Sequence, residues 1–188
     1  MAQSSTTISS QKDHKVNITG TDISFTASTK TISATSTSLS NLAVRDLITI
    51  TGTTNNNSTF TVKSVATNGL SITVEETVTT ESSGASVTLD YTGFVTDKYQ
   101  GDGYYSQADG VHTVAYHVLS TLTGSVKMQG SLATTPTESD WFDIAGTTFT
   151  TDQSTTIFSA NFTGNFVWVR AKATGVTAGS VMKILYNH

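Results

Sequence analysis

The chain has 188 residues, which suffices for one large β domain or two small ones. Only 13% of the residues are charged, the formal net charge is −4, and the lysines and arginines are scattered, so no basic run is present to neutralise phosphates and we do not expect nucleic-acid binding. There is no cysteine, which excludes disulfides and thiolate metal sites, and no apolar run approaches the roughly 20 residues of a membrane helix.

Residues 1–20 are polar, with weakly spaced apolar side chains at Val16 and Ile18. We interpret them as an N-terminal arm, which is either a frayed terminus or a segment that docks on a neighbouring subunit. Val16 and Ile18 are the candidate contact residues of this arm. The first five residues have neither the basic nor the apolar region of a secretory signal, so we expect synthesis in a cytoplasm.

Between residues 21 and 91, short stretches alternate apolar residues with threonine or serine. Side chains on a strand alternate between its faces, so each stretch buries one face and exposes the other. Threonine suits the exposed face because its branched Cβ fits a pleated sheet. The pair Asn68-Gly69 lies between two such stretches and predicts a hairpin. We expect a small barrel or sandwich with strands at 23–25, 30–34, 47–51, 60–65, 70–74 and 85–89.

Residues 92–110 are rich in glycine, aspartate and tyrosine. They are either a linker or the first irregular strand of a second unit. We favour the strand, because linkers seldom carry apolar bodies such as those of Tyr99, Tyr104 and Tyr105.

Residues 111–188 contain six further stretches that predict strands of a second, jelly-roll-like sandwich, at 112–119, 124–132, 141–144, 156–162, 165–172 and 180–185. In one of them, aliphatic residues alternate with Trp168, Arg170 and Lys172. This strand should therefore have one aliphatic face and one face with an aromatic ring and two cations. No stretch predicts a helix of normal length.

No stretch carries a catalytic signature. His112 and His117 lie an odd number of positions apart, so one strand would direct them to opposite faces, and no histidine pair has metal-ligand spacing. Glu75 with Glu76, and Asp140 with Asp143, lie in no recognisable glycosidase motif, although a depolymerase with two facing carboxylates remains an alternative. We expect no enzyme activity, no catalytic residue, no cofactor and no metal site.

The aromatic residues Trp141, Phe142, Phe166 and Trp168 have two interpretations. They are either a sandwich core with one outward tryptophan, or a platform that stacks on a sugar or anchors another subunit. Trp141 and Trp168 are the candidate ligand-stacking residues. Trp168 and Arg170 are also candidate subunit contacts, because the residues beside them should point to the other face.

Three stretches of the second unit form a distinctive set: Gly-Ser-Val-Lys-Met-Gln-Gly-Ser-Leu at 124–132, Pro-Thr-Glu-Ser-Asp-Trp-Phe at 136–142 and Gly-Asn-Phe-Val-Trp-Val-Arg-Ala at 164–171. They resemble a β-sandwich module in structural proteins of tailed bacteriophages, especially virion proteins of phages that infect marine cyanobacteria. The first unit, from Ile23 to Leu89 with its Gly-Thr-Thr-Asn-Asn-Asn-Ser loop at 52–58, is similar to a small β module of such proteins. The resemblance implies a virion component that assembles into symmetric copies.

From these observations we expect an all-β fold in three parts: an arm at 1–20, a small barrel or sandwich at 21–91 and a sandwich at 92–188. The expected function is that of a non-enzymatic structural protein of a phage particle, in its capsid, neck, tail or fibre. Its partners should be other copies, with a trimer favoured by analogy, and other virion proteins. The alternative is a module that binds a glycan of the host surface. Neither nucleic acid nor membrane is an expected partner.

Overall fold

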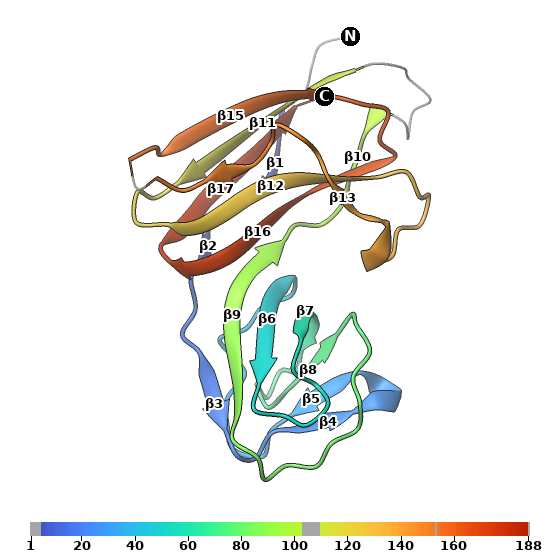
Figure 1. Cartoon of the computed structure of the whole chain (residues 1–188), viewed down its shortest axis with the longest axis vertical. Helices are drawn as coiled ribbons and strands as arrows, with labels where there is room; N and C mark the ends of the chain where they lie inside the picture. The colour runs from blue at the N-terminus through green and yellow to red at the C-terminus, as the bar shows by residue number, and fades with distance from the viewer. Residues whose placement is uncertain (1–4, 103–109, 153, 188) are drawn as a thin grey trace. The chain divides into compact units, whose positions relative to one another are not determined.

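The computed structural model describes residues 5–102, 110–152 and 154–187 (Figure 1). It is all-β, with 53% strand and 4% helix, which confirms the fold class that the alternating pattern predicts. The chain forms two compact units. The first is continuous, Lys15–Phe94, and is called the inserted unit below; the second combines Met1–His14 with Val95–His188 and is called the split unit.

The inserted unit is one antiparallel path of strands in the order β3–β9–β6–β7–β8–β5–β4. Isoleucine, valine, leucine and phenylalanine from alternate positions point inward, and Ile32, Ile48 and Ile50 are fully buried. The strands are β3 (Ile18–Gly20), β4 (Ser24–Thr26), β5 (Thr31–Ser33), β6 (Asp46–Thr51), β7 (Thr59–Val65), β8 (Ser71–Val74) and β9 (Val87–Val95), with a 3₁₀ turn η1 (Ala27–Thr29).

The hairpin expected at Asn68-Gly69 joins β7 to β8, which pair antiparallel. Gly69 has a φ of 67°, in the left-handed region that glycine adopts without a Cβ penalty. The Asn68 side chain closes the turn by accepting a hydrogen bond from the Leu70 N–H at 3.0 Å. Local turn chemistry therefore sets the register of these two strands.

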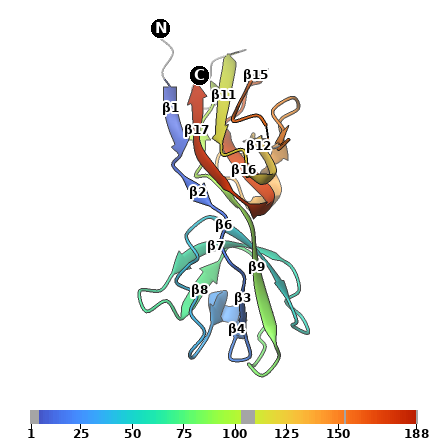
Figure 2. The same cartoon turned by 90° about the vertical axis from the view of Figure 1, so that its left-hand side faces the viewer.

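The split unit has two antiparallel sheets. The first has the order β1–β17–β11–β15, with β2 also paired to β17, and Figure 2 shows these four strands from left to right. The second is built on β12 and β16, with short β10, β13 and β14 at their sides. Its elements are β1 (Ser5–Ser9), β2 (Lys12–Asp13), β10 (Tyr99–Gln100), β11 (Val111–Val118), β12 (Thr123–Ser131), η3 (Glu138–Asp140), β13 (Phe142–Asp143), β14 (Phe149–Thr150), β15 (Ile157–Thr163), β16 (Trp168–Ala178) and β17 (Ser180–Asn187).

The core of the split unit lies between buried side chains of both sheets. Tyr116 and Tyr186 come from the first sheet, and Met128 and Val169 come from the second. The Tyr116 hydroxyl donates to the Thr147 carbonyl at 2.9 Å, so the phenol is buried with its polar atom bonded. Burial raises the pKa of Tyr116 well above its usual range, although the bond to Thr147 opposes this change.

The N-terminal arm expected at residues 1–20 is corrected by the structure. Residues 5–9 and 12–13 pair with β17 and belong to the split unit, whereas residues 18–20 pair with β9 in the inserted unit. Ile8 is buried, with 4% of its surface exposed. The sequence signal was weak because these strands are short, rich in serine and threonine, and paired with segments far along the chain.

The boundary between the units also differs from the expected one at residue 91. Strand β9 continues to Val95, and the inserted unit ends at Phe94. The irregular strand expected within 92–110 is present as β10, in which Tyr99 pairs with Val169. Tyr104 and Tyr105 lie outside the described residues. Among those that the structure does describe, no helix has the length and apolar character needed to cross a membrane.

Candidate functional site

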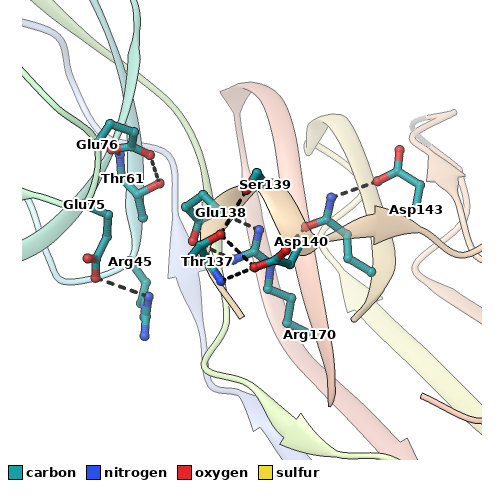
Figure 3. Close-up of polar contacts among 11 residues, drawn as sticks. Arg45, Thr61, Glu75, Glu76, Thr137, Glu138, Ser139, Asp140, Asp143 and Arg170 are labelled. Atoms are coloured by element: carbon teal, nitrogen blue, oxygen red, sulfur yellow. Dashed lines mark hydrogen bonds and ion pairs between the residues drawn. The ribbon is translucent and has the colours of Figure 1, made fainter. Parts of the chain in front are cut away.

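The side chain of Arg170 is the centre of a polar network on the second sheet of the split unit (Figure 3). It is buried, with only 3% of the residue exposed. Its two terminal nitrogens donate to the Glu138 carboxylate at 2.9 and 2.8 Å, and its Nε donates to Gln129 Oε1 at 2.9 Å. The guanidinium also lies over the Trp141 ring, 4.3 Å from its centroid. A paired fork of this kind fixes both distance and orientation, and we call these four residues the Arg170 hub.

The short 3₁₀ helix η3 positions Glu138 for this contact. Thr137 precedes the helix and Asp140 ends it, and together they form a capping box. Asp140 accepts from the Thr137 hydroxyl and from the Thr137 N–H, both at 2.7 Å. Those two bonds hold the pKa of Asp140 below its usual value. Asp140 therefore maintains the shape of the loop that brings Glu138 to Arg170.

The network continues from the hub across β12. The Gln129 amide donates to Asp143 at 2.9 Å, and the other oxygen of Asp143 lies 2.5 Å from the Lys127 ammonium. Burial raises the pKa of Asp143, but the hydrogen bonds from Lys127 and Gln129 outweigh it, so the net direction is downward. Lys172 is half-buried on the same strand as Arg170, and its pKa is lowered first by burial and then by the Arg170 charge.

The two tryptophans predicted to stack on a ligand are both half-buried, and each has a cation on its ring. Trp168 donates from its indole N–H to the Thr134 carbonyl at 3.0 Å, and the Lys98 ammonium lies 4.1 Å from its ring centroid. Trp141 lies against Arg170 as described above. The strand alternation predicted for this region is present, because Val169 and Ala171 are fully buried on the opposite face.

The predicted subunit-contact residues differ in exposure. Val16 is 78% exposed, so its side chain is on the surface, as a contact residue requires. Ile18 is 8% exposed and contributes to the core of the inserted unit, and Arg170 is buried in its own hub. The expectation that Ile18 and Arg170 present their side chains to another subunit is therefore wrong. Both are used inside the chain, because β3 pairs with β9 and η3 covers Arg170.

The carboxylates considered for catalysis all have partners in the described structure (Figure 3). In the inserted unit, Glu75 lies 3.7 Å from Arg45, and Glu76 accepts from the N–H and hydroxyl of Thr61 at 2.7 and 2.8 Å. Asp140 and Asp143 belong to the capping box and the Arg170 network. Among the residues that the structure describes, no group of three or more histidine or carboxylate side chains is arranged to hold a metal ion.

A second polar cluster, which sequence reasoning did not find, surrounds His112 in the core of the split unit. The imidazole is fully buried, with Nδ1 2.7 Å from the Tyr186 hydroxyl and Nε2 3.2 Å from the Gly164 carbonyl. It stacks on Phe162 and lies 3.6 Å from an Asp102 oxygen. Burial raises the pKa of Tyr186 well above its usual range, and the Asp102 charge adds to this change.

Sequence reasoning also missed Gln129 and Glu138 as partners of Arg170. The available signal was the capping box that Thr137 and Asp140 form around Glu138. A carboxylate on such a turn is held in a fixed direction, which makes Glu138 a candidate partner for a cation. A scan against protein-family models found no match, and a search of curated proteins found none either.

Proposed function

We propose that this chain is a non-enzymatic structural protein of a tailed-phage virion, which assembles with other copies and docks on other virion proteins. The observation that carries the proposal is the composition of the Arg170 hub. Gln129 lies in the stretch 124–132, Glu138 and Trp141 lie in 136–142, and Arg170 lies in 164–171. These are the three stretches that resemble the phage β-sandwich module.

The residues that carry the resemblance are thus the ones that join two strands and a loop of the same sheet. Their polar atoms bond to one another, and the network extends from Gln129 to Asp143. A network centred on a buried arginine, with a bidentate ion pair and a hydrogen bond to glutamine, supports a role in which the sandwich keeps one shape. The proposed location is the capsid, the neck, the tail or a fibre of the particle.

The experiment is mass spectrometry of density-purified phage particles from a culture that expresses the chain from its native gene, followed by immunogold labelling with an antibody to the full chain. We expect peptides of the chain at a constant ratio to the major capsid protein, and label at one position on the particle. Absence of the chain from particles that are otherwise complete would refute the proposal.

The second candidate function is recognition of a host-surface glycan. Trp141 and Trp168 favour it, because both are partly exposed aromatic rings beside polar side chains. A sugar would have to use the ring face of Trp168 opposite Lys98, or displace that lysine. Trp168→Ala should abolish retention on host polysaccharide, whereas Phe142→Ala, at an aromatic residue that is 44% exposed on β13, should not. Equal retention of both variants would contradict this function.

A further inference from the structure

Strand β15 (Ile157–Thr163) ends the first sheet of the split unit and pairs with β11 on one side only (Figure 1). Its sequence, Ile-Phe-Ser-Ala-Asn-Phe-Thr, has no charged residue and no proline. Its seven residues pair with β11 in one unbroken register. Edge strands that stay single in solution are normally short, charged, interrupted by proline or bulged. Strand β15 has none of these protections.

The other terminal strands of the described sheets do carry such protection. Strand β1, at the opposite end of the same sheet, has a register shift between Thr7 and Ser9. Strand β4 has three residues and β13 has two. Strand β15 is therefore the one long, regular terminal strand in the described part of the chain, and it is the edge on which another strand can be added.

The pairing with β11 determines which backbone groups of β15 face that open side. The Val118 N–H donates to the Thr156 carbonyl at 2.9 Å, so the backbone N–H and C=O groups of Thr156 are directed toward β11. Because these directions alternate along an antiparallel strand, positions 158, 160 and 162 also point toward β11. The N–H and C=O groups of Ile157, Ser159, Asn161 and Thr163 are then directed to the open edge.

The sequence of β15 is nearly symmetric about Ala160. When it is paired antiparallel with itself about this residue, Phe158 lies opposite Phe162 and Ser159 lies opposite Asn161. Aromatic pairs and hydroxyl–amide pairs are favourable directly across strands. The outward-directed residues Ser159 and Asn161 also fall on the same rung, where each could exchange two backbone hydrogen bonds with the other copy.

We propose that β15 of one copy pairs antiparallel with β15 of a second copy, about a two-fold axis at Ala160. This is a self-complementary contact between identical surfaces. Phe158, which is half-buried and stacks on Tyr116 and Phe149, would be covered by the partner's Phe162. Ile157, which is 57% exposed, would lie opposite the partner's Thr163. The inference rests on the proposed function only in taking a second copy as the occupant.

The first test changes the charges on one rung of the full-length protein. In S159K/N161K, each lysine faces a lysine of the other copy, and in S159E/N161E each glutamate faces a glutamate. Like charges directly opposite one another destabilise a pair of strands, so each variant alone should dimerise roughly tenfold or more weakly than the wild type, as measured by sedimentation equilibrium.

Mixing the two variants, or combining the changes as S159K/N161E, places lysine opposite glutamate and should restore the dimer. This recovery shows that the variants are folded and that position 159 faces position 161. A wild-type monomer overturns the proposal. So does a dimer that the S159K/N161K and S159E/N161E changes leave intact.

The second test uses the absence of cysteine from the chain. At Ala160 the two strands would form a pair without mutual backbone hydrogen bonds, with Cα atoms about 4.5 Å apart, which a disulfide can span. Mild oxidation of A160C should give a covalent dimer, whereas T7C, on the opposite edge of the same sheet, should stay monomeric on a non-reducing gel. Equal cross-linking of both would overturn the proposal. None of these outcomes alters the mass-spectrometric test of the virion role.

Discussion

The inserted and split units hold their polar groups in different ways. In the inserted unit, single carboxylates each accept several hydrogen bonds from one loop. Asp22 accepts hydrogen bonds from the backbone and hydroxyls of Thr35, Ser36 and Thr37, and Glu81 accepts from the N–H groups of Thr54 and Asn55. In the split unit, the Arg170 hub joins side chains from three separate stretches around one buried guanidinium. One chain thus combines partly exposed carboxylates that each hold a single loop with a side-chain network centred on a buried cation.

The inserted unit is one continuous segment, whereas the split unit combines two segments of the chain. The largest effect that we expect is therefore on the folding of each unit when it is expressed alone. Residues 15–94 expressed alone should fold, because the pairings that join strands β3 through β8 to one another and to β9 all lie within them. Residues 95–188 alone lack β1 and β2, which leaves one side of β17 unpaired and its neighbours without Ile8. We expect them to lose cooperative thermal unfolding, as measured by circular dichroism.

The matched control joins residues 1–14 to residues 95–188 through a short glycine–serine linker in place of the inserted unit. This chain should recover cooperative unfolding. If residues 95–188 fold equally well without residues 1–14, then β1 and β2 do not contribute to the stability of the split unit, and its division into two segments has no cost in folding free energy.

The second effect tests the Arg170 hub. Arg170→Met should lower the free energy of unfolding of the split unit by about 1–2 kcal/mol, because it removes three hydrogen bonds from the guanidinium, one of them to the buried Gln129, whereas the partly exposed Glu138 carboxylate is solvated instead. Both tryptophans of the chain lie in this unit, so urea titration followed by tryptophan fluorescence reports on it selectively. Lys172→Met, on the same face of β16, should change the free energy by less than about 1 kcal/mol. Equal losses of unfolding free energy in Arg170→Met and Lys172→Met would show that the contacts of the hub do not stabilise the split unit beyond those of another cation on the same face.

The third effect concerns the alkaline range. Burial raises the pKa values of Tyr116 and Tyr186 in the folded state, so the stability they contribute is complete below their usual pKa of about 10 and is lost as the pH rises above it. Tyr116→Phe removes one hydrogen bond, which costs about 1 kcal/mol at neutral pH, and it should lessen the alkaline loss. Tyr99→Phe is the control at a less buried phenol. If the stability of Tyr116→Phe and of the wild type depends on pH in the same way above about pH 10, ionisation of Tyr116 does not contribute to the alkaline loss.

The smallest effect tests the partly exposed carboxylates that each hold a single loop. The hydroxyl of Thr37, followed by the N–H groups of Thr37 and Ser36, holds the pKa of Asp22 far below its usual range. The stability from this carboxylate is present above about pH 4 and is lost as the pH falls below it. Asp22→Asn should lower the melting temperature of the inserted unit at pH 7, and the difference from wild type should shrink in acid.

Amide NMR resonances of residues 21–37 provide the readout for Asp22→Asn, and tryptophan fluorescence should not change. Asp152→Asn removes a similar carboxylate in the split unit, where Asp152 accepts from the N–H groups of Ser154 and Thr155. This control should therefore alter the tryptophan signal instead. A constant difference between Asp22→Asn and wild type down to pH 2 would contradict the role of the charge.

Local patterns were sufficient to predict most strands. The alternation in β6, β7 and β8 and the Asn68-Gly69 turn encode structure within a few residues, so the sequence predicted them. Strand β1 was not predicted, because its pairing with β17 depends on a segment at the other end of the chain. Arg170 was expected on the surface for the same reason: the carboxylate and indole that cover it come from η3 and its flank, which no periodic pattern connects to β16.

The division of one unit into two segments has a consequence for synthesis on the ribosome. The inserted unit can fold once residue 94 has left the exit tunnel, because its strands are contiguous. The segment 5–13 must wait for β17, its partner, which is made after all the other described strands. Until β17 has been made, these residues stay without their final neighbours, so the nascent chain carries strand segments whose backbone groups lack their native partners.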